Sequence, residues 1–445
     1  MNAPPSQAPA AAPPGLPRRL ARTLHVLWRL LAPRPAPVVR YDWFVPDEVT
    51  RLEQALPLPP TGRVDDPTWR DMDMPRYVDH LAAELSILGR QVLCCRLRRG
   101  ATGGLAYTWL QAESQTVREA PALQRAWAAL HPLRTVRTEL AGPLFGPAPP
   151  DLPVWARWLW VLPVALGASL ALGAVAGWAA GGLALLATVV VSARAQIALH
   201  APLVQWQSER SALCSLLAAD LAVAAVARQA PHARLDDCAD QHGVTLRLLH
   251  RLRPGWVERL PALADYANLL LLHQYRLLGR QRRALQEELP ALQAVFWRVG
   301  TLELDLALWR HLRRTPVHCQ AQAAGPGCLV LDDVVHPLLA PAHPLSLQLQ
   351  QRGALVTGEN GAGKSTLLRT VGLNVIVARA FGFCYARRAE LASAPAFTVF
   401  SSLQVEDSLH TATSLFMAEL ARAQALVQAT HQDSAVLVLV DEIFR

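Results

Sequence analysis

The spacing of hydrophobic and polar positions divides this 445-residue chain into three kinds of sequence. Residues 41–150 and 199–320 repeat apolar side chains every three or four positions, which predicts two mainly helical segments. Between them, residues 158–192 contain no charged side chain. From residue 325 onward, short apolar runs alternate with helical periodicity, which predicts an α/β segment with a partly parallel sheet over residues 325–445.

The uncharged stretch is long enough to enter a membrane. A membrane-spanning helix needs about 20 apolar residues, and one helix over the whole stretch would run roughly 52 Å, beyond a hydrocarbon core of about 30 Å. We therefore expect a transmembrane hairpin over residues 155–198 that turns near residues 177–182. A single tilted span and a buried helical hairpin of a soluble protein are the alternatives.

The flanks of this stretch suit a membrane boundary. Trp155, Trp158 and Trp160 stand at its start, and tryptophan is enriched at membrane–water interfaces. Arg157 and Arg194 lie on its two sides. Because basic residues favour the cytoplasmic side, we expect both ends of the hairpin to face the cytoplasm.

Residues 1–40 form a basic amino-terminal segment. Its first 15 residues are rich in Pro and Ala, which predicts disorder. Residues 16–35 place leucines at helical spacing among arginines, which fits either a helix on a membrane surface or a solvated helix. Arg29 interrupts the short apolar run, so the pattern does not indicate a signal peptide.

Charge and cysteine content narrow the choice of partner and compartment. The formal charge of +8 suits a nucleic acid or an anionic membrane surface and does not choose between them. Seven cysteines, with no CxxC spacing, predict reduced thiols in a reducing cytosol rather than a disulfide framework or a zinc site.

The stretch "GENGAGKS", residues 358–365, fits the phosphate-binding pattern GxxxxGK[ST]. Before it, "GALVTG" predicts a short apolar strand, and after it residues 364–380 predict a helix. Glycine lets backbone amides close around phosphate oxygens, and the helix start adds partial positive charge. The expected ATP-binding residues are Gly358, Glu359, Asn360, Gly361, Ala362, Gly363, Lys364, Ser365 and Thr366.

Two of these residues have distinct chemical roles in the motif. Lys364 is the single lysine of the chain, although arginine is abundant, and its compact charge suits the β- and γ-phosphates. The Ser365 hydroxyl suits a Mg²⁺ ligand. We count Lys364 among the catalytic residues and Ser365 among the metal ligands.

A second acidic motif lies near the carboxyl end of the chain. The apolar run 436–440 predicts a buried parallel strand, and Asp441 follows at the end where α/β sheets place ligands. We expect Asp441 to join Ser365 in holding Mg²⁺ and Glu442 to polarise the attacking water.

Together these segments resemble the MutS family of DNA mismatch-repair ATPases, within the wider ABC class. The resemblance rests on "TGENGAGKSTLLRTVGLNVIVARAFGFCYARRAEL", on "VVHPLL" before it, and on "SSLQVEDSLHTATSLFMAEL" and "LVLVDEIFR" after it. It is strong over 325–445 and weaker over 60–320, where "DDPTWRDMDM" and the long helices resemble the family's helical core and lever. The hairpin resembles that of membrane-anchored, MutS-related bacterial proteins.

The resemblance implies a homodimer with composite ATP sites, in which Ser414 meets the partner's γ-phosphate. The family's signature turn has glycine where this chain has Ala412 and Thr413. The Phe-x-Glu wedge of the mismatch-reading domain has no match, so the implied DNA contact is to the backbone with low sequence specificity. The implied location is the bacterial inner membrane with the ATPase domain facing the cytoplasm.

In that family, "DEIFR" continues into a dimer-contact loop, a strand, a switch histidine and a closing helix. We therefore expect an ATPase domain that is incomplete at its carboxyl end and a chain that is a fragment of a longer one. On this basis ATP binding is a safer prediction than turnover.

The predicted function is a MutS-like ATPase that couples ATP to DNA association at the membrane. The first alternative is a catalytically incomplete nucleotide-binding scaffold. The second is an ABC transporter ATPase, against which the Leu-Ser-Gly-Gly-Gln signature is missing before the acidic strand.

Overall fold

A computed structural model describes most of the chain: residues 37–40, 43–58, 62–100, 120–148, 152–229, 235, 242–253, 255, 267–268, 271–350, 352–392, 398–403, 415–432 and 436–441. The chain forms two units, residues 1–38 and 39–445, and the fold described here is that of the second. The predictions for the first 36 residues lie outside the described residues.

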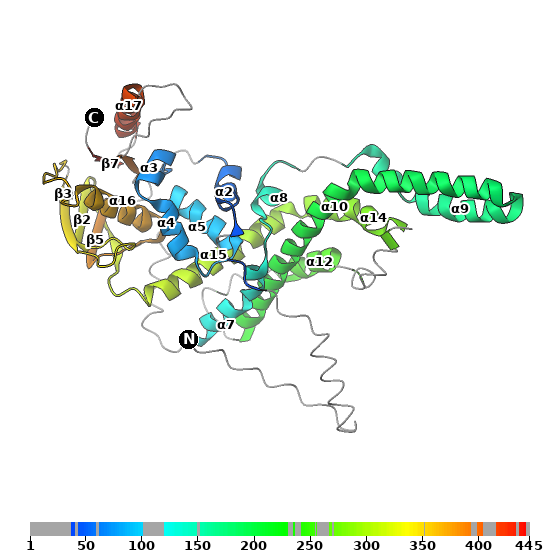
Figure 1. Cartoon of the computed structure of the whole chain (residues 1–445). Coiled ribbons are helices and arrows are strands. Elements are labelled where there is room, and N and C mark those ends of the chain that lie inside the picture. The colour runs from blue at the N-terminus through cyan, green and yellow to red at the C-terminus, as the bar shows by residue number, and fades with distance from the viewer. Residues whose placement is uncertain are drawn as a thin grey trace. The chain divides into compact units, whose positions relative to one another are not determined.

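Helices form the described part of the second unit before residue 319 (Figure 1). They are α2 (Pro46–Ala55), α3 (Asp66–Asp71), α4 (Met74–Ala82), α5 (Ile87–Arg99), α7 (Ala120–Ala129), η2 (His131–Thr135), α8 (Ala141–Phe145), η3 (Val154–Trp158), α9 (Val161–Ala176), α10 (Trp178–Gln229), α12 (His242–Leu252), α14 (His273–Glu287) and α15 (Leu289–Leu312).

Helix α5 is the centre of the helical part, and its residues are buried on almost every side. It begins at Ser86, whose hydroxyl accepts the Gly89 amide at 3.2 Å, and it ends at Gly100, whose φ of 79° suits glycine. It packs against α2, α4, α15 and α16 (Lys364–Phe381). Because α16 is the helix that follows the glycine-rich loop, the helical core supports that loop directly.

The strands form a mixed five-stranded sheet and a separate parallel pair. Their bounds are β1 (Cys319–Ala324), β2 (Cys328–Val334), β3 (Leu345–Gln350), β4 (Phe383–Cys384), β5 (Arg388–Ala392), β6 (Thr398–Ser402) and β7 (Val436–Val440), with α17 (Leu415–Gln432) between the last two.

In the larger sheet the order is β3-β2-β5-β1-β4, with β1 and β5 parallel and the other pairs antiparallel. β6 and β7 pair in parallel, with Thr398 opposite Val436 and Ser402 opposite Val440. The buried face of α16 contacts both groups of strands. The sequence-based prediction of a mostly helical chain followed by a mixed α/β segment is confirmed.

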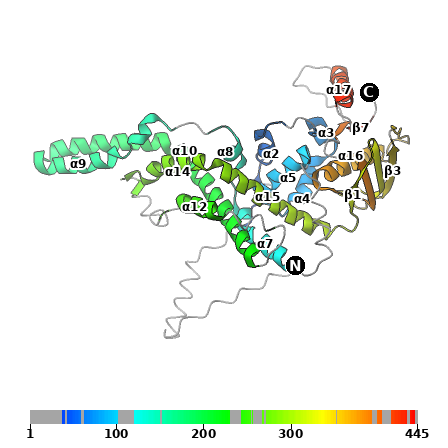
Figure 2. The same ribbon diagram turned by 180° about the vertical axis from the view of Figure 1, so that it is seen from behind.

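α9 and the first part of α10 form an antiparallel hairpin that turns at Gly177, where φ is 98° (Figures 1 and 2). Small residues line the inside. A Cβ on Gly181 would lie 2.3 Å from the Cα of Gly173, and the hydroxyls of Ser169 and Thr188 are 3.4 Å apart. The turn therefore lies inside the predicted interval of residues 177–182.

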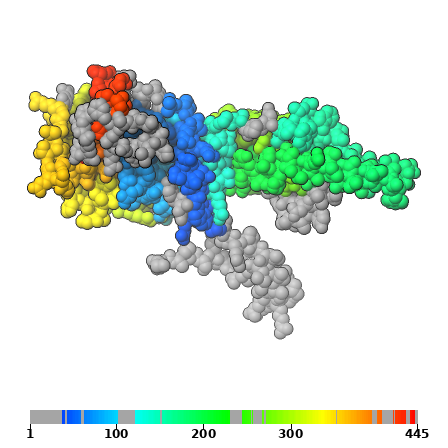
Figure 3. Space-filling view, turned by 45° about the horizontal axis from the view of Figure 1, so that its top comes forward, coloured from blue at the N-terminus to red at the C-terminus, as the bar shows by residue number. Residues whose placement is uncertain are grey.

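Large apolar side chains lie on the outside of this hairpin. Val175 is 88% exposed, Trp178 80% and Leu183 71%, and the face turned to the viewer in Figure 3 is not covered by other elements. Among the described residues, Trp178–Gln229 is long and apolar enough to cross a membrane, and Val161–Ala176 is a shorter apolar helix. Large apolar groups outside and small or polar groups inside reverse the arrangement expected of a hairpin buried in a soluble core.

Candidate functional site

The glycine-rich loop curls tightly before α16. Gly361 and Gly363 take φ values of 85° and 93°, a region that side chains with a Cβ rarely adopt. No neighbouring atom among the described residues lies within 4 Å of a Cβ built on either glycine, so backbone conformation is the reason for glycine here. Gly363 caps α16 without a side-chain hydrogen bond, which leaves the helix-start amides to other partners.

Lys364 folds back over its own loop. Its Nζ donates to the carbonyl oxygens of Gly358 at 2.7 Å and Glu359 at 3.3 Å. The rest of the loop, including Asn360 and Ala362, is exposed, and so is Thr366 in the first helical turn. The predicted ATP-binding residues from 358 to 366 therefore lie together on one exposed turn and helix start.

Ser365 and Asp441 meet at the base of this loop although 76 positions separate them. The Ser365 hydroxyl donates to Oδ2 of Asp441. Asp441 is held in place by its own amide, which donates to the Ser402 carbonyl at 3.0 Å at the end of β6. A serine hydroxyl beside a carboxylate, at a helix start, is an oxygen donor set suited to Mg²⁺. Glu442 and Ser414 lie outside the described residues.

The prediction of a strand over residues 353–358 is wrong. These residues form no strand, and Leu355 is 91% exposed. Beside them lies a cavity of about 860 Å³, lined mainly by apolar side chains of β2, β3, α16 and β7, which also reaches Lys364 and Asp441. The apolar composition of the segment suits a strand, but here residues 353–356 line the wall of this cavity and form no strand pairing. β7, by contrast, forms the predicted parallel strand, although Val440 at its end is 36% exposed.

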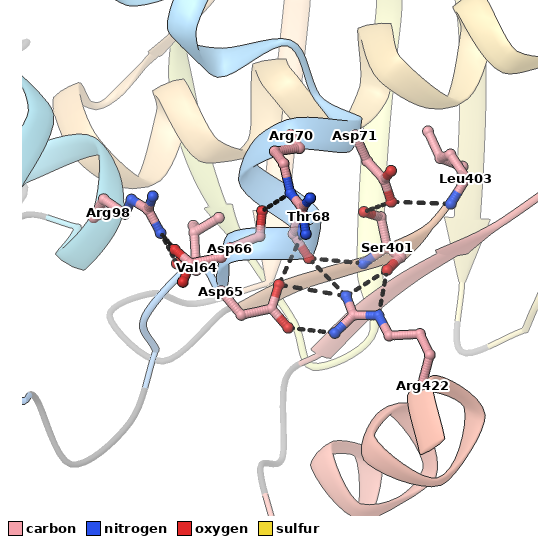
Figure 4. A network of polar contacts seen from close by, with 10 residues as sticks. All are labelled: Val64, Asp65, Asp66, Thr68, Arg70, Asp71, Arg98, Ser401, Leu403 and Arg422. Atoms are coloured by element: carbon pink, nitrogen blue, oxygen red, sulfur yellow. Dashed lines mark hydrogen bonds and ion pairs between the residues drawn. The ribbon is translucent and has the colours of Figure 1, made fainter. Parts of the chain in front are cut away.

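A polar network connects the strand β6 to the short helix α3 and to Asp65 at its start (Figure 4). Asp71, at the end of α3, is buried, and its carboxylate accepts the Ser401 hydroxyl at 2.6 Å and the Leu403 amide at 2.9 Å. The Ser401 amide donates to the Thr68 hydroxyl at 3.0 Å. Arg369 of α16 adds a bond from Nε to the Asp71 carbonyl at 3.0 Å. α3 thus contacts both β6, whose end lies beside Asp441, and α16, the helix after the loop.

Arg422 of α17 completes this network. Its guanidinium pairs with the Asp65 carboxylate, donates from Nη2 to the Thr68 hydroxyl at 3.1 Å, and donates from Nε to the Ser401 carbonyl at 2.8 Å. Burial tends to raise the pKa of Asp65, but the hydrogen bonds from Arg422 and Thr68 outweigh it and hold that pKa below its usual value. Arg422, Asp65 and Asp71 were not predicted to lie together, because no local pattern in the sequence indicates their contact.

Comparison with known proteins supports a relationship to the MutS family. Residues 354–445 match the family described as MutS domain V. The chain is similar to the DNA mismatch repair protein MutS of Lactobacillus delbrueckii subsp. bulgaricus, with 28% identity over 201 residues that cover 42% of this chain and 23% of the relative. It is also similar to MutS of Chlorobium phaeobacteroides, with 29% identity over 185 residues that cover 39% of this chain and 20% of the relative.

A shorter match carries higher identity. MutS of Chlorobium phaeovibrioides is 38% identical over 96 residues, which cover 22% of this chain and 10% of the relative. The chain thus spans less than a quarter of the length of these relatives. A MutS-like relationship to DNA mismatch-repair proteins is supported at this coarse level, for about two fifths of the chain.

Proposed function

We propose that the chain binds ATP with Mg²⁺ and acts as a MutS-like ATPase that associates with DNA at a membrane. The observation that carries the proposal is the contact between Ser365 and Asp441 beneath an exposed, glycine-bent loop. The site fits the nucleotide because the loop amides and the helix start suit phosphate oxygens, and because the serine–aspartate pair suits the metal.

Each residue has one role in this proposal. The loop from Gly358 to Gly363 holds the phosphates through its backbone, and Lys364 exchanges its two loop carbonyls for phosphate oxygens. Ser365 and Asp441 would hold the ion, which would supply positive charge next to the phosphates. Glu442 orients the water if the chain hydrolyses ATP.

The single lysine gives a direct test of ATP binding. An amine-reactive reagent can modify only Lys364 and the chain's α-amino group. ATP with Mg²⁺ should slow labelling of Lys364 and leave labelling of the α-amino group unchanged, as read by peptide mass spectrometry. Equal labelling with and without ATP, at concentrations up to the millimolar range, would overturn the proposal.

The metal role has a matched pair of variants. Asp441→Asn should remove the Mg²⁺ dependence of ATP binding, because an amide is a weaker ligand than a carboxylate for a hard cation. Asp333→Asn makes the same chemical change on a partly exposed residue that pairs with Arg387 and does not line the cavity, and it should leave binding unchanged. Hydrolysis by the wild-type chain that is lost in Glu442→Gln would support turnover, and ATP binding without hydrolysis would favour the nucleotide-binding scaffold.

The membrane part of the proposal is supported by the hairpin. Its small residues pack inside, and its large apolar residues face outward. α9 has 16 residues, about 24 Å of helix, and η3 with its exposed tryptophans precedes it. We expect the protein to float with phosphatidylcholine vesicles after alkaline washing. Recovery in the soluble fraction would refute insertion and favour a soluble hairpin.

The DNA part is supported by the similarity to DNA mismatch repair proteins and by the formal charge of +8. Contacts to phosphates release counterions, so binding should weaken steeply as salt rises. Filter binding to homoduplex, mismatched and branched DNA, at two salt concentrations, tests this. Retention that is absent at low salt for all three DNAs would remove DNA from the proposal. Sedimentation with and without ATP tests the proposed homodimer.

A further inference from the structure

The base of the hairpin is held by a small apolar cluster separate from the main core. Its buried members come from three elements, namely the end of η3, the middle of α10 and the start of α14: Leu159, Ala195, Leu199, Leu203, Leu272 and Tyr275. Ala156 of η3 packs against it. Figure 2 shows α14 beside the part of α10 that follows the hairpin. α14 is about 80 residues beyond the hairpin in sequence, yet it begins at the hairpin's base.

Each of these three elements places an exposed arginine next to a cluster residue. Arg157 follows Ala156, Arg194 precedes Ala195, and Arg276 follows Tyr275. Arg280 is exposed one helical turn after Arg276. We call Arg157, Arg194, Arg276 and Arg280 the arginine collar.

The collar is surrounded by sequence without negative charge. Residues 152–208 contain no aspartate or glutamate, and neither do residues 273–286. Trp155, Trp158 and Trp160, next to Arg157 in sequence, are exposed, and the guanidinium of Arg157 is 5.8 Å from the centre of the Trp158 ring. Tryptophan and arginine beside an apolar hairpin are the residues that contact lipid headgroups at a membrane surface.

We propose that the arginine collar binds the phosphates of anionic lipids at the base of the inserted hairpin, so that the protein selects negatively charged lipid. This rests on the membrane insertion proposed above. The arginines of α14 do not flank the hairpin in sequence, so the flanking charges alone would not include them in this surface. α14 connects the helical core to the proposed bilayer surface, because it contacts α10 and α12 and leads directly into α15.

The test compares two double variants of equal charge. Arg276→Gln with Arg280→Gln removes the α14 part of the collar, and Arg247→Gln with Arg253→Gln removes two exposed arginines from around α12, outside the cluster. Each protein is inserted into vesicles of mixed phosphatidylcholine and phosphatidylglycerol, extracted in mild detergent, and analysed for co-purified lipid. A basic residue near a charged surface contributes about fivefold, so the collar variant should lose about 25-fold in phosphatidylglycerol preference.

The outcomes are distinct. Loss of preference in the collar variant, with preference kept in the α12 variant, supports the proposal. Equal preference in both variants, or none in the wild type once it floats with neutral vesicles, overturns the collar and leaves insertion intact. Failure of the wild type to float with any vesicle refutes insertion itself. If the collar variant loses salt-sensitive DNA retention while its lipid preference is unchanged, the surface is a nucleic-acid contact and the proposal is overturned.

Discussion

Replacing Arg422 tests whether α17 is held to the helical core by the network of Figure 4. The side chains of Arg422 and Asp65 are 12% and 27% exposed, so the pair lies between a surface ion pair, which contributes about 0–1 kcal/mol, and a buried one, whose disruption costs about 3–5 kcal/mol. We expect Arg422→Ala to weaken the attachment of α17 by about 2 kcal/mol. Arg422→Lys should recover part of this, because an ammonium cannot reach Asp65 and the Ser401 carbonyl together.

Amide hydrogen exchange of α17 measures this attachment, because a helix with few packed neighbours opens locally before the whole protein unfolds. A loss of about 2 kcal/mol corresponds to about 30-fold faster exchange. Arg388→Ala, which breaks an exposed pair with Glu390, is the matched control and should leave α17 unchanged. Exchange in Arg422→Ala within twofold of the wild type would refute the clamp.

The same pair has a defined pH dependence. Because the folded pKa of Asp65 is lowered, its contribution is present above the unfolded value of about 3.9 and is lost as pH falls through the folded pKa. The protection of α17 in the wild type should therefore decline below about pH 4, and Arg422→Ala should lack most of that decline.

Two further substitutions test other parts of the fold. Gly181→Ala should separate α9 from α10 and lower the free energy of unfolding by about 1–3 kcal/mol, because its Cβ would lie 2.3 Å from the backbone of Gly173. A Cβ on Gly182 meets nothing within 4 Å, so Gly182→Ala should be neutral or stabilising. Thermal unfolding in detergent compares the two variants. Burial raises the pKa of Glu303, so its contribution is lost as pH rises from about 4.3 through the folded pKa. The stability of Glu303→Gln relative to the wild type should rise with pH in that window, as measured by denaturant unfolding, and a parallel pair of pH curves would contradict it.

Features that depend on local sequence could be predicted. The loop needed glycine at positive φ, and the pattern placed Gly361 and Gly363 there. The hairpin length followed from the absence of charge over more residues than one span needs, and the turn at Gly177 lies in the expected interval. The apolar run before Asp441 predicted β7, because continuous hydrophobicity is typical of a strand covered on both faces.

Features that depend on tertiary contacts could not be predicted. Residues 353–358 carry a short apolar run typical of a strand, but whether they pair depends on the neighbouring edge, which local pattern does not report. Arg422 and Asp65 are 357 positions apart, and an arginine within a helix is usually solvated. The sequence around Arg276 and Arg280 gives no sign of the hairpin about 80 residues earlier, and only the cluster that contains Tyr275 places the start of α14 at the hairpin's base.

The helix α3 offers a route by which the helical core can affect the proposed ATP site without contacting it. Asp71 holds the residues on both sides of Ser402 through the Ser401 hydroxyl and the Leu403 amide. The Ser402 carbonyl in turn accepts the amide of Asp441. Ser402, which holds the backbone of the proposed metal ligand Asp441, therefore lies between two residues that the buried carboxylate of Asp71 binds.

Asp71→Ala would release that backbone. The change removes two hydrogen bonds to a charged acceptor, each contributing about 1.5–3 kcal/mol, and leaves two donors without their acceptor. If the released backbone fixes Asp441 less well, ATP affinity measured with Mg²⁺ should fall by about tenfold. The affinity measured without Mg²⁺ should stay within about twofold, because the loop amides are not disturbed. Glu84→Ala, which removes an exposed carboxylate of the core, should change neither. An equal loss with and without Mg²⁺ would mean that Asp71 stabilises the fold generally, and no loss in either would mean that the core and the metal ligand are uncoupled.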